Sequence, residues 1–267
     1  MPAEPLASIL VLAVGLVFGS FLNVCIHRLP LGQSVVAPGS RCPRCGAPVR
    51  AWHNVPVVSW ILLRARCAAC REPISWRYPA VEALTGVSLL FLWWAYGAGS
   101  GFAIASLFAL AMIVLFFTDF DHQLLPDLVT LPGFLVGIAV AWFNPFLGDP
   151  GWDRIVRSVA GAALGSGLLW GIGALYSRLR GVEAMGFGDV KMMAMVGAFT
   201  GPSGVAVTLF AASVVGAAAG LALVAAKGKS LQATLPFGCF LAPAAMAALL
   251  WGRRAVEGYL GLLHLGR

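Results

Sequence analysis

Two short stretches of the sequence place aspartates directly beside apolar runs. FFTDFDHQLLPD carries Asp119, Asp121 and Asp127, and GFGDVK carries Asp189. The chain has only 11 Asp and Glu residues, so these two stretches concentrate a scarce residue type. Ionisable side chains within apolar spans or at their ends are costly to place there, which makes these aspartates candidates for function.

Two carboxylates from different segments that meet at one depth can perform acid and base catalysis together. Like charges brought close cannot both ionise, so such a pair shares one proton. The ionised carboxylate takes a proton from an attacking water, while the protonated one polarises a peptide carbonyl. No G-x-S-x-G or Ser-His-Asp arrangement is evident, and the four histidines make no metal-ligand pair. These residue types therefore favour an aspartyl membrane protease.

Asp189 has the strongest local signal for function. Gly186 and Gly188 precede it, and residues without Cβ let a backbone come close to a neighbouring group or a substrate. Asp189 then opens an apolar stretch, where the dipole of a helix N-terminus favours an anion. Helix capping alone is the structural alternative.

The three aspartates of the first stretch carry different expectations. Asp119 and Asp121 are two positions apart, so on one helix they project about 200° apart and only one can face a partner. Side-chain chemistry leaves the choice between them open, and a solvated helix end is the alternative for both. Asp127 follows Pro126 where the next helix would begin, and we predict that it caps that helix.

The composition indicates a membrane protein. Apolar residues make up 60% of the 267 residues and charged residues 11%, whereas soluble domains carry about 25% charged residues. Runs near the ~20 residues that a span requires can be placed at 6–26, 79–97, 101–118, 128–145, 156–177, 187–200, 203–226 and 234–252. We therefore predict an all-α polytopic membrane protein with about eight transmembrane helices.

Basic residues set the expected orientation. The segment between the first two spans contains eight arginines: Arg28, Arg41, Arg44, Arg50, Arg64, Arg66, Arg71 and Arg77. Cytoplasmic connections carry the excess of Lys and Arg, so this segment is expected in the cytoplasm. The net charge of +7 then reflects topology, and we expect no nucleic-acid partner.

The same segment carries a metal-type signature. CPRC and CAAC supply Cys42, Cys45, Cys67 and Cys70, with 21 residues between the two pairs. Two C-x-x-C knuckles at about this spacing are typical of a zinc ribbon, in which four thiolates surround one structural ion. Disulfides or reduced thiols without a role are the alternatives, and the cytoplasmic assignment disfavours disulfides.

Several motifs in order along the chain resemble the type IV prepilin peptidases. They are GSFLNVCIHRLP, the paired knuckles, HNVPVVSW, RYPAVE, DFDHQLLPD and GFGDVKMMAMVGA. The resemblance implies a multi-pass protein of the bacterial cytoplasmic membrane that cleaves the basic leader of prepilins and pseudopilins at the cytoplasmic face. It also implies Asp119 and Asp189 as the catalytic pair, and we expect Gly186, Gly188 and Asp121 to support them.

Many members of that family also methylate the new N-terminal amine with a methyl group from S-adenosylmethionine. The resemblance associates this activity with the first span and the following loop, with Gly19, Asn23 and Glu82 as candidate residues. No glycine-rich dinucleotide fingerprint locates the cofactor. An interhelical hydrogen bond from Asn23, and a pair between Glu82 and Arg77, are the structural alternatives.

The resemblance also implies a division of the chain into three parts. These are a first transmembrane helix at 1–27, a cysteine-bearing cytoplasmic loop at 28–78, and a seven-helix peptidase domain at 79–267. One departure from the family pattern is Ala65 in RARC, where glycine is common.

Two rival interpretations use the same acids. A presenilin-like protease that cuts within the bilayer would have its aspartates near mid-span. A proton-coupled transporter would use Asp119, Asp189 and Glu82 as proton carriers, and it would show repeat symmetry that this sequence lacks.

Overall fold

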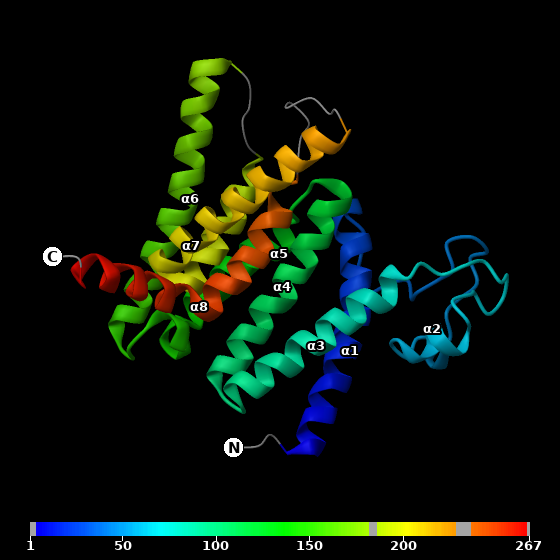
Figure 1. The fold of residues 1–267 in the computed structure, drawn as a ribbon. Helices are drawn as coiled ribbons and strands as arrows, with labels where there is room; N and C mark the ends of the chain where they lie inside the picture. The colour runs from blue at the N-terminus through cyan, green and yellow to red at the C-terminus, as the bar shows by residue number, and fades with distance from the viewer. Residues whose placement is uncertain (1–3, 182–185, 228–235, 266–267) are drawn as a thin grey trace. The chain divides into compact units, whose positions relative to one another are not determined.

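The computed structural model describes residues 4–181, 186–227 and 236–265 (Figure 1). Within these ranges the regular elements are α-helices and short 3₁₀ helices, and β-structure is limited to two isolated bridges. The prediction of an all-α protein is confirmed.

Among the described residues, six helices are long and apolar enough to cross a membrane. They are α1 (Pro5–Arg28), α3 (Arg77–Tyr96), α4 (Ser100–His122), α6 (Trp152–Arg180), α7 (Phe187–Lys227) and α8 (Gly238–Leu265). The shorter elements are α2 (Val58–Leu62), α5 (Asp127–Ala139), η1 (Leu29–Leu31), η2 (Ala51–His53), η3 (Ala141–Phe143) and η4 (Pro145–Leu147).

The difference between six long helices and the predicted eight spans lies in α5 and α7. The predicted span 128–145 contains only the short helix α5, which ends at Ala139. Two 3₁₀ turns, η3 and η4, follow it in place of further α-helix. The predicted spans 187–200 and 203–226 both lie in α7. Gly201 between them has φ 69° and ψ −176°, outside the helical region. The first two residues of the predicted span 234–252 lie outside the described ranges.

The kink in α7 leaves two backbone carbonyls that neighbouring segments satisfy. Pro202 follows Gly201 and has no N–H to donate to the carbonyl of Ala198. The Ser158 hydroxyl on α6 donates to that carbonyl instead, at 2.7 Å, and Asn144 Nδ2 donates to the carbonyl of Phe199 at 2.8 Å. A buried, apolar surrounding tolerates such a break only when the freed polar groups find partners like these.

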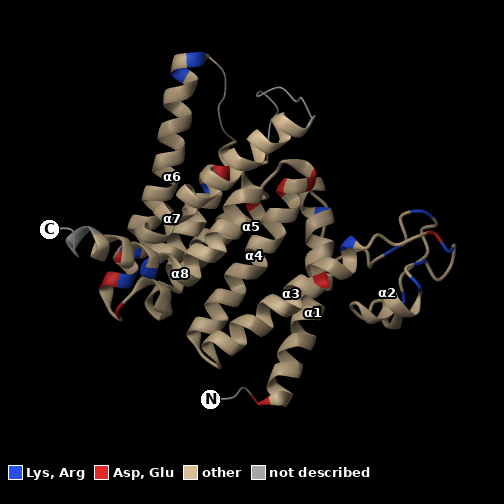
Figure 2. Cartoon of the chain, viewed as in Figure 1, with Lys and Arg blue, Asp and Glu red and all other residues tan. Residues whose placement is uncertain are grey.

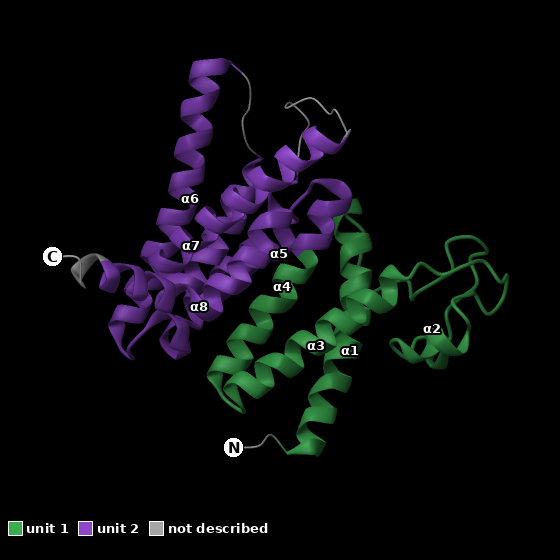
Figure 3. Ribbon diagram, viewed as in Figure 1, with its two compact units in different colours: residues 1–114 green, residues 115–267 purple. Residues whose placement is uncertain are grey.

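The chain forms two compact units, residues 1–114 and 115–267, which we describe separately (Figure 3). In the first unit α1 packs against α3 through small residues: a Cβ at Gly15 would lie 2.7 Å from the Cα of Gly86. In the second unit α7 packs against α5, α6 and α8. Gly161 on α6 and Gly197 on α7 bring their backbones so close that a Cβ on either would collide with the other. Small residues allow this close helix packing in membranes.

The segment between α1 and α3 has a different character from the helices. Figure 2 shows Lys and Arg gathered along this segment of the first unit, whereas α1 and α3 themselves are mostly uncharged. The segment contains α2, η2 and the four-cysteine cluster.

Candidate active site and metal centre

Asp119 lies in the last turn of α4 and is 5% exposed. The backbone N–H of Cys239, at the beginning of α8, donates to its Oδ2 at 2.9 Å. The first N–H groups of a helix have no partner within the helix, and the dipole there stabilises negative charge. Gly238 makes this approach possible, because a Cβ at that position would lie 2.8 Å from the same oxygen.

Asp189 lies in the first turn of α7, and its backbone N–H donates to the carbonyl of Gly186 at 3.1 Å. It is within electrostatic range of Asp119. Leu125 lies between the beginnings of α7 and α8: a Cβ at Gly188 would be 3.1 Å from Leu125 Cβ, and one at Gly238 would be 3.1 Å from Leu125 Cδ2. The beginnings of two helices thus bring the two aspartates into one neighbourhood.

The other two aspartates of the first stretch lie differently. Asp121 is exposed. The prediction that Asp127 caps α5 is wrong: the capping residue is Pro126, and no side chain caps this helix. Asp127 instead receives two hydrogen bonds of 2.7 Å from Lys191 Nζ, because that ammonium reaches it from α7. This ion pair ties the beginning of α5 to the helix that carries Asp189.

Sequence reasoning missed Gly238, Cys239, Leu125 and Lys191 in this site. The Cys239 side chain is buried, and its backbone N–H is the group that meets Asp119. A signal was present, because PFGCF repeats the Phe-Gly pair of GFGD at the beginning of another apolar run.

The four cysteines of the knuckles come together as predicted from their spacing. The sulfurs of Cys42, Cys45, Cys67 and Cys70 all lie within 4.8 Å of one another, and Cys42 Sγ is 3.8 Å from Cys70 Sγ. Four thiolates about 2.3 Å from one zinc ion place their sulfurs about 3.8 Å apart. The donor set therefore fits a tetrahedral structural zinc ion.

The two knuckles have matching backbones. The bridge Arg41–Pro48 closes the first and Arg66–Pro73 the second. Backbone N–H groups point at the sulfurs: those of Cys70 and Ala69 lower the pKa of the Cys67 thiol to about 6. This arrangement favours the thiolate of Cys67, the form that binds a metal.

The candidate methyltransferase residues Gly19, Asn23 and Glu82 lie where α1 packs against α3. A Cβ at Gly19 would lie 2.5 Å from the Cα of Glu82. Asn23 Nδ2 donates to the carbonyl of Tyr78 at 3.1 Å, which confirms the interhelical hydrogen bond considered for it. The Glu82 carboxylate accepts from the backbone N–H of Val57 at 2.7 Å, and the alternative pair between Glu82 and Arg77 stays a prediction.

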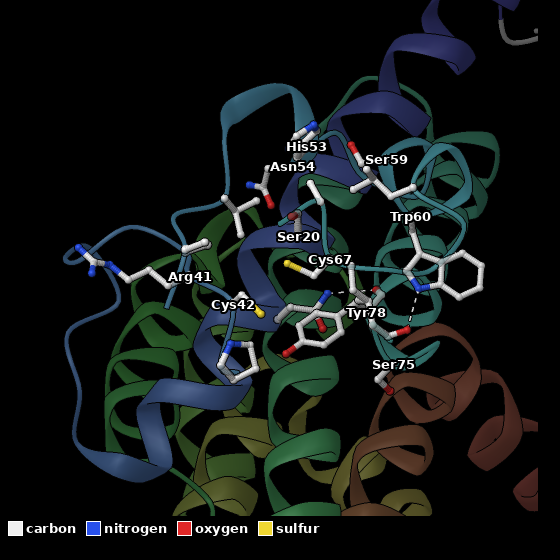
Figure 4. Close-up of a pocket in the computed structure, with 18 of the residues that line it drawn as sticks. Ser20, Arg41, Cys42, His53, Asn54, Ser59, Trp60, Cys67, Ser75 and Tyr78 are labelled. Atoms are coloured by element: carbon white, nitrogen blue, oxygen red, sulfur yellow. Dashed lines mark hydrogen bonds between the residues drawn. The ribbon is translucent and has the colours of Figure 1, made fainter. Parts of the chain in front are cut away.

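A cavity of about 810 Å³ opens beside this crossing (Figure 4). Its walls come from α1, the beginning of α3 and the cysteine-bearing segment, and include Ser20, Asn23, His53, Trp60, Tyr78 and Glu82. Cys42 and Cys67 also line it, so the knuckles form part of its wall. The Trp60 indole is fixed at the edge by donating to the carbonyl of Ile74 at 3.1 Å.

Comparison with known proteins places this geometry in a family. Residues 13–96 match the bacterial peptidase A24 N-terminal domain, and residues 106–221 match the type IV leader peptidase family. A prepilin leader peptidase/N-methyltransferase from Stutzerimonas stutzeri is 35% identical to the chain, over 99% of this chain and 98% of its own length. The chain belongs to the type IV leader peptidase family.

Proteins with the same name give similar matches from other organisms. The one from Pseudomonas putida is 36% identical over 94% of this chain and 92% of its own length. The one from Neisseria gonorrhoeae is 39% identical over 85% of this chain and 84% of its own length. No solved structure gives a significant match. Asp119 and Asp189 both fall in the range that matches the leader peptidase model, and the cavity belongs to the range that matches the N-terminal domain.

Ala65, the departure from the leader peptidase pattern, lies in a tight turn of the backbone. Ala65 has φ 56° and the preceding Arg64 has φ 51°, in the left-handed region that favours glycine. Hydrogen bonds hold the turn on both sides: the Ala65 N–H donates to the carbonyl of Trp60, and its carbonyl accepts from the N–H of Ile74. The Cβ is thus accommodated in a backbone that glycine would adopt more easily.

Proposed function

We propose that this leader peptidase family member cleaves the basic leader from prepilins and pseudopilins and methylates the new N-terminal amine. The observation that carries the peptidase assignment is the buried Asp119, held by a helix N-terminus beside Asp189. The methyltransferase assignment is supported by the relatives, which are named as prepilin leader peptidase/N-methyltransferases.

Asp119 and Asp189 share one proton in the proposed mechanism. The ionised carboxylate takes a proton from water, whose oxygen attacks the scissile carbonyl carbon, and the protonated carboxyl gives its proton to the carbonyl oxygen. When the tetrahedral intermediate collapses, the C–N bond breaks and the leaving nitrogen takes back a proton. Gly188 supports the pair by letting the beginning of α7 approach Leu125, and Gly186 supports it through its carbonyl, which accepts from the Asp189 N–H. Exposed Asp121 faces the water from which the reaction draws.

The proposed location is the bacterial cytoplasmic membrane, with the active site on the cytoplasmic side. The excess of arginine between α1 and α3 supports this orientation. The membrane lipid surrounds the spans, and a substrate of this class presents a basic leader followed by an apolar helix. We also propose the division into a first helix at 1–27, a methyltransferase-associated loop at 28–78 and a peptidase domain at 79–267.

Two small groups complete the proposed enzyme. Zinc bound by Cys42, Cys45, Cys67 and Cys70 would close the knuckles as a structural ion without an open coordination position. S-adenosylmethionine supplies an electrophilic methyl group. S-adenosylmethionine combines a cation, a flat heterocycle and polar groups. The cavity walls fit such a molecule, because Glu82 offers a carboxylate to the cation and Trp60 and Tyr78 offer aromatic faces to the heterocycle.

Replacement of either catalytic aspartate tests the peptidase assignment. We expect Asp119→Asn and Asp189→Asn each to lower the rate of prepilin cleavage by at least about 100-fold, because the pair loses its acid–base function. Cleavage is followed on gels with purified protein, and the melting temperature reports folding. Asp153→Asn, an exposed acid in the first turn of α6, is the matched control and should cleave normally.

Cleavage that survives in either variant would refute the assignment. Absence of cleavage by the unaltered chain would instead favour the second candidate, a proton-coupled transporter that uses the same carboxylates.

A further inference from the structure

We propose that the segment between α1 and α3 docks onto the membrane through the outer face of α2, which consists of Val58, Ile61 and Leu62. The partner is the headgroup region of a bilayer that contains anionic lipid. Trp52 enters that region beside the outer face, and arginines on either side of α2 contact lipid phosphates. The inference depends on neither proposed activity, because it concerns only where this segment lies.

The first support is that α2 carries its apolar side chains outward. Val58, Ile61 and Leu62 stand at positions i, i+3 and i+4, so they share one side of the helix. They are 49%, 61% and 76% exposed. Ser59, which has a hydroxyl group, is buried and donates to the carbonyl of Trp52 at 3.1 Å. A helix whose outer face meets water shows the reverse pattern, so this face suits an apolar surrounding.

The second support is the type of residue on either side of α2. Trp52 is 65% exposed, and the Arg50 guanidinium lies 5.5 Å from the centroid of its ring. Trp76, directly before α3, is 72% exposed. Tryptophan is enriched at membrane–water interfaces, where the apolar ring enters the headgroup region. Arg64 follows α2, and guanidinium groups bind phosphate with paired hydrogen bonds.

The third support is the charge of the segment. Residues 29–76 contain six arginines, and their one acid, Glu72, is paired with Arg44. An anionic lipid surface attracts a basic segment that is anchored beside it. A basic prepilin leader would be repelled by the same arginines, so their charge favours lipid as the occupant of the outer face.

The fourth support is the level at which α2 is held. Val57, directly before α2, donates its N–H to the Glu82 carboxylate at 2.7 Å. Glu82 in turn lies against Gly19, where a Cβ would be 2.5 Å from the Glu82 Cα. Gly19 is nine residues before Arg28, the last residue of α1, or about 13 Å along the helix axis. The beginning of α2 is therefore held beside the membrane helices and not beyond their ends (Figure 1).

The anchoring of the segment makes a small docking face sufficient. Five residues of helix would not hold a free protein on a membrane. Here α1 and α3 fix both ends of the segment to the bilayer, so the docking step is in effect intramolecular. A weak contact is enough when the two partners are already held together.

Photo-crosslinking identifies what covers the outer face. The full-length, zinc-loaded variant Leu62→benzoylphenylalanine is placed in vesicles of phosphatidylethanolamine and phosphatidylglycerol, irradiated and analysed by mass spectrometry. We expect phospholipid adducts at position 62. Arg44→benzoylphenylalanine is the control, since the Arg44 side chain in the first knuckle is 73% exposed, and it should give far fewer adducts. Position 62 crosslinked to residues 115–267 or to a second copy of the chain, or equal lipid adducts at both positions, would overturn the inference.

Hydrogen exchange measures the docking with natural side chains. The full-length protein is placed in bilayer discs of the same lipids, and exchange is followed in peptides that cover α2. We expect exchange to be about tenfold faster in Leu62→Asn, because the leucine loses its apolar burial. Val36→Asn, which removes another exposed apolar side chain of the same segment, should leave the exchange of α2 unchanged. A leucine that faces water would lose nothing on this change, so unaltered exchange in Leu62→Asn would overturn the docking.

The charge of the lipid tests the arginines. Exchange in α2 should be about fivefold faster in discs of phosphatidylcholine alone, the effect of roughly one arginine near an anionic surface. The double variant Arg50→Gln, Arg64→Gln should remove this difference between lipids. The control Arg178→Gln, Arg180→Gln changes two exposed arginines at the end of α6 and should retain it. Equal exchange of the unaltered chain in both lipids would overturn anionic lipid as the partner.

Discussion

Asp119 shows how the proposed peptidase site depends on single atoms of its neighbours. Its carboxylate receives a backbone N–H, and the glycine before that N–H leaves room for it. The four cysteines could be predicted from sequence because the C-x-x-C spacing reflects the geometry of one ion. The Cys239 contact was missed, because a backbone donor leaves no mark in its own residue type and only the Phe-Gly pair before it gave a signal. The cap expected at Asp127 failed because Lys191, 64 positions away, forms an ion pair with it.

The close approach at Gly238 gives a prediction at the residue scale. In Gly238→Ala the new Cβ would lie 2.8 Å from Asp119 Oδ2, so the carboxylate must move. We expect the cleavage rate to fall by about 10- to 100-fold, because misplacing a reacting group by about 1 Å can cost that much. Gly258→Ala is the control in the same helix, where a Cβ meets nothing. Similar cleavage rates in the two variants would contradict the role of this contact.

At the scale of the elements, α7 is both the longest helix and a broken one. The sequence predicted a boundary between 187–200 and 203–226, because Gly-Pro interrupts the apolar run. It could not predict that the segment continues as one kinked helix. This continuity depends on Ser158 and Asn144, which donate to the carbonyls of Ala198 and Phe199 just before the break. Those partners come from elements that no local pattern connects to α7.

The kink yields a prediction about stability. Ser158→Ala leaves the buried carbonyl of Ala198 without the side-chain donor that replaces Pro202. We expect the free energy of unfolding to fall by about 1–3 kcal/mol, the cost of a buried unsatisfied polar group. Ser166→Ala is the control, because Ser166 bonds to the carbonyl of Ala162 within its own helix. Denaturant unfolding in detergent compares the two, and an equal loss in both would contradict this account of the kink.

At the scale of the whole molecule, the two proposed chemistries fall in different compact units. Glu82, the cavity and the cysteines belong to residues 1–114, whereas Asp119 and Asp189 belong to residues 115–267. The ranges that match the two family models divide in a similar way, at 13–96 and 106–221. Composition was sufficient to predict a helical membrane protein, but periodicity does not reveal where one compact unit ends.

Removal of zinc should therefore affect the two activities unequally. Cys42 and Cys67 line the cavity, so loss of the ion would open one of its walls. After treatment with a strong chelator we expect methylation of a synthetic peptide with a free N-terminal α-amine to be lost and to return when zinc is added back. Prepilin cleavage should keep a larger fraction of its rate. Metal content is measured alongside both activities, and zinc-free protein that methylates normally would contradict the prediction.

The contact between Asp119 and the beginning of α8 has a consequence for mutational surveys. Its donor is a main-chain nitrogen, so every residue placed at position 239 except proline retains it. Alanine scanning would therefore score Cys239 by its thiol alone and record a tolerant position. A substitution at position 239 can thus be tolerated although Asp119 depends on the main-chain N–H at that position.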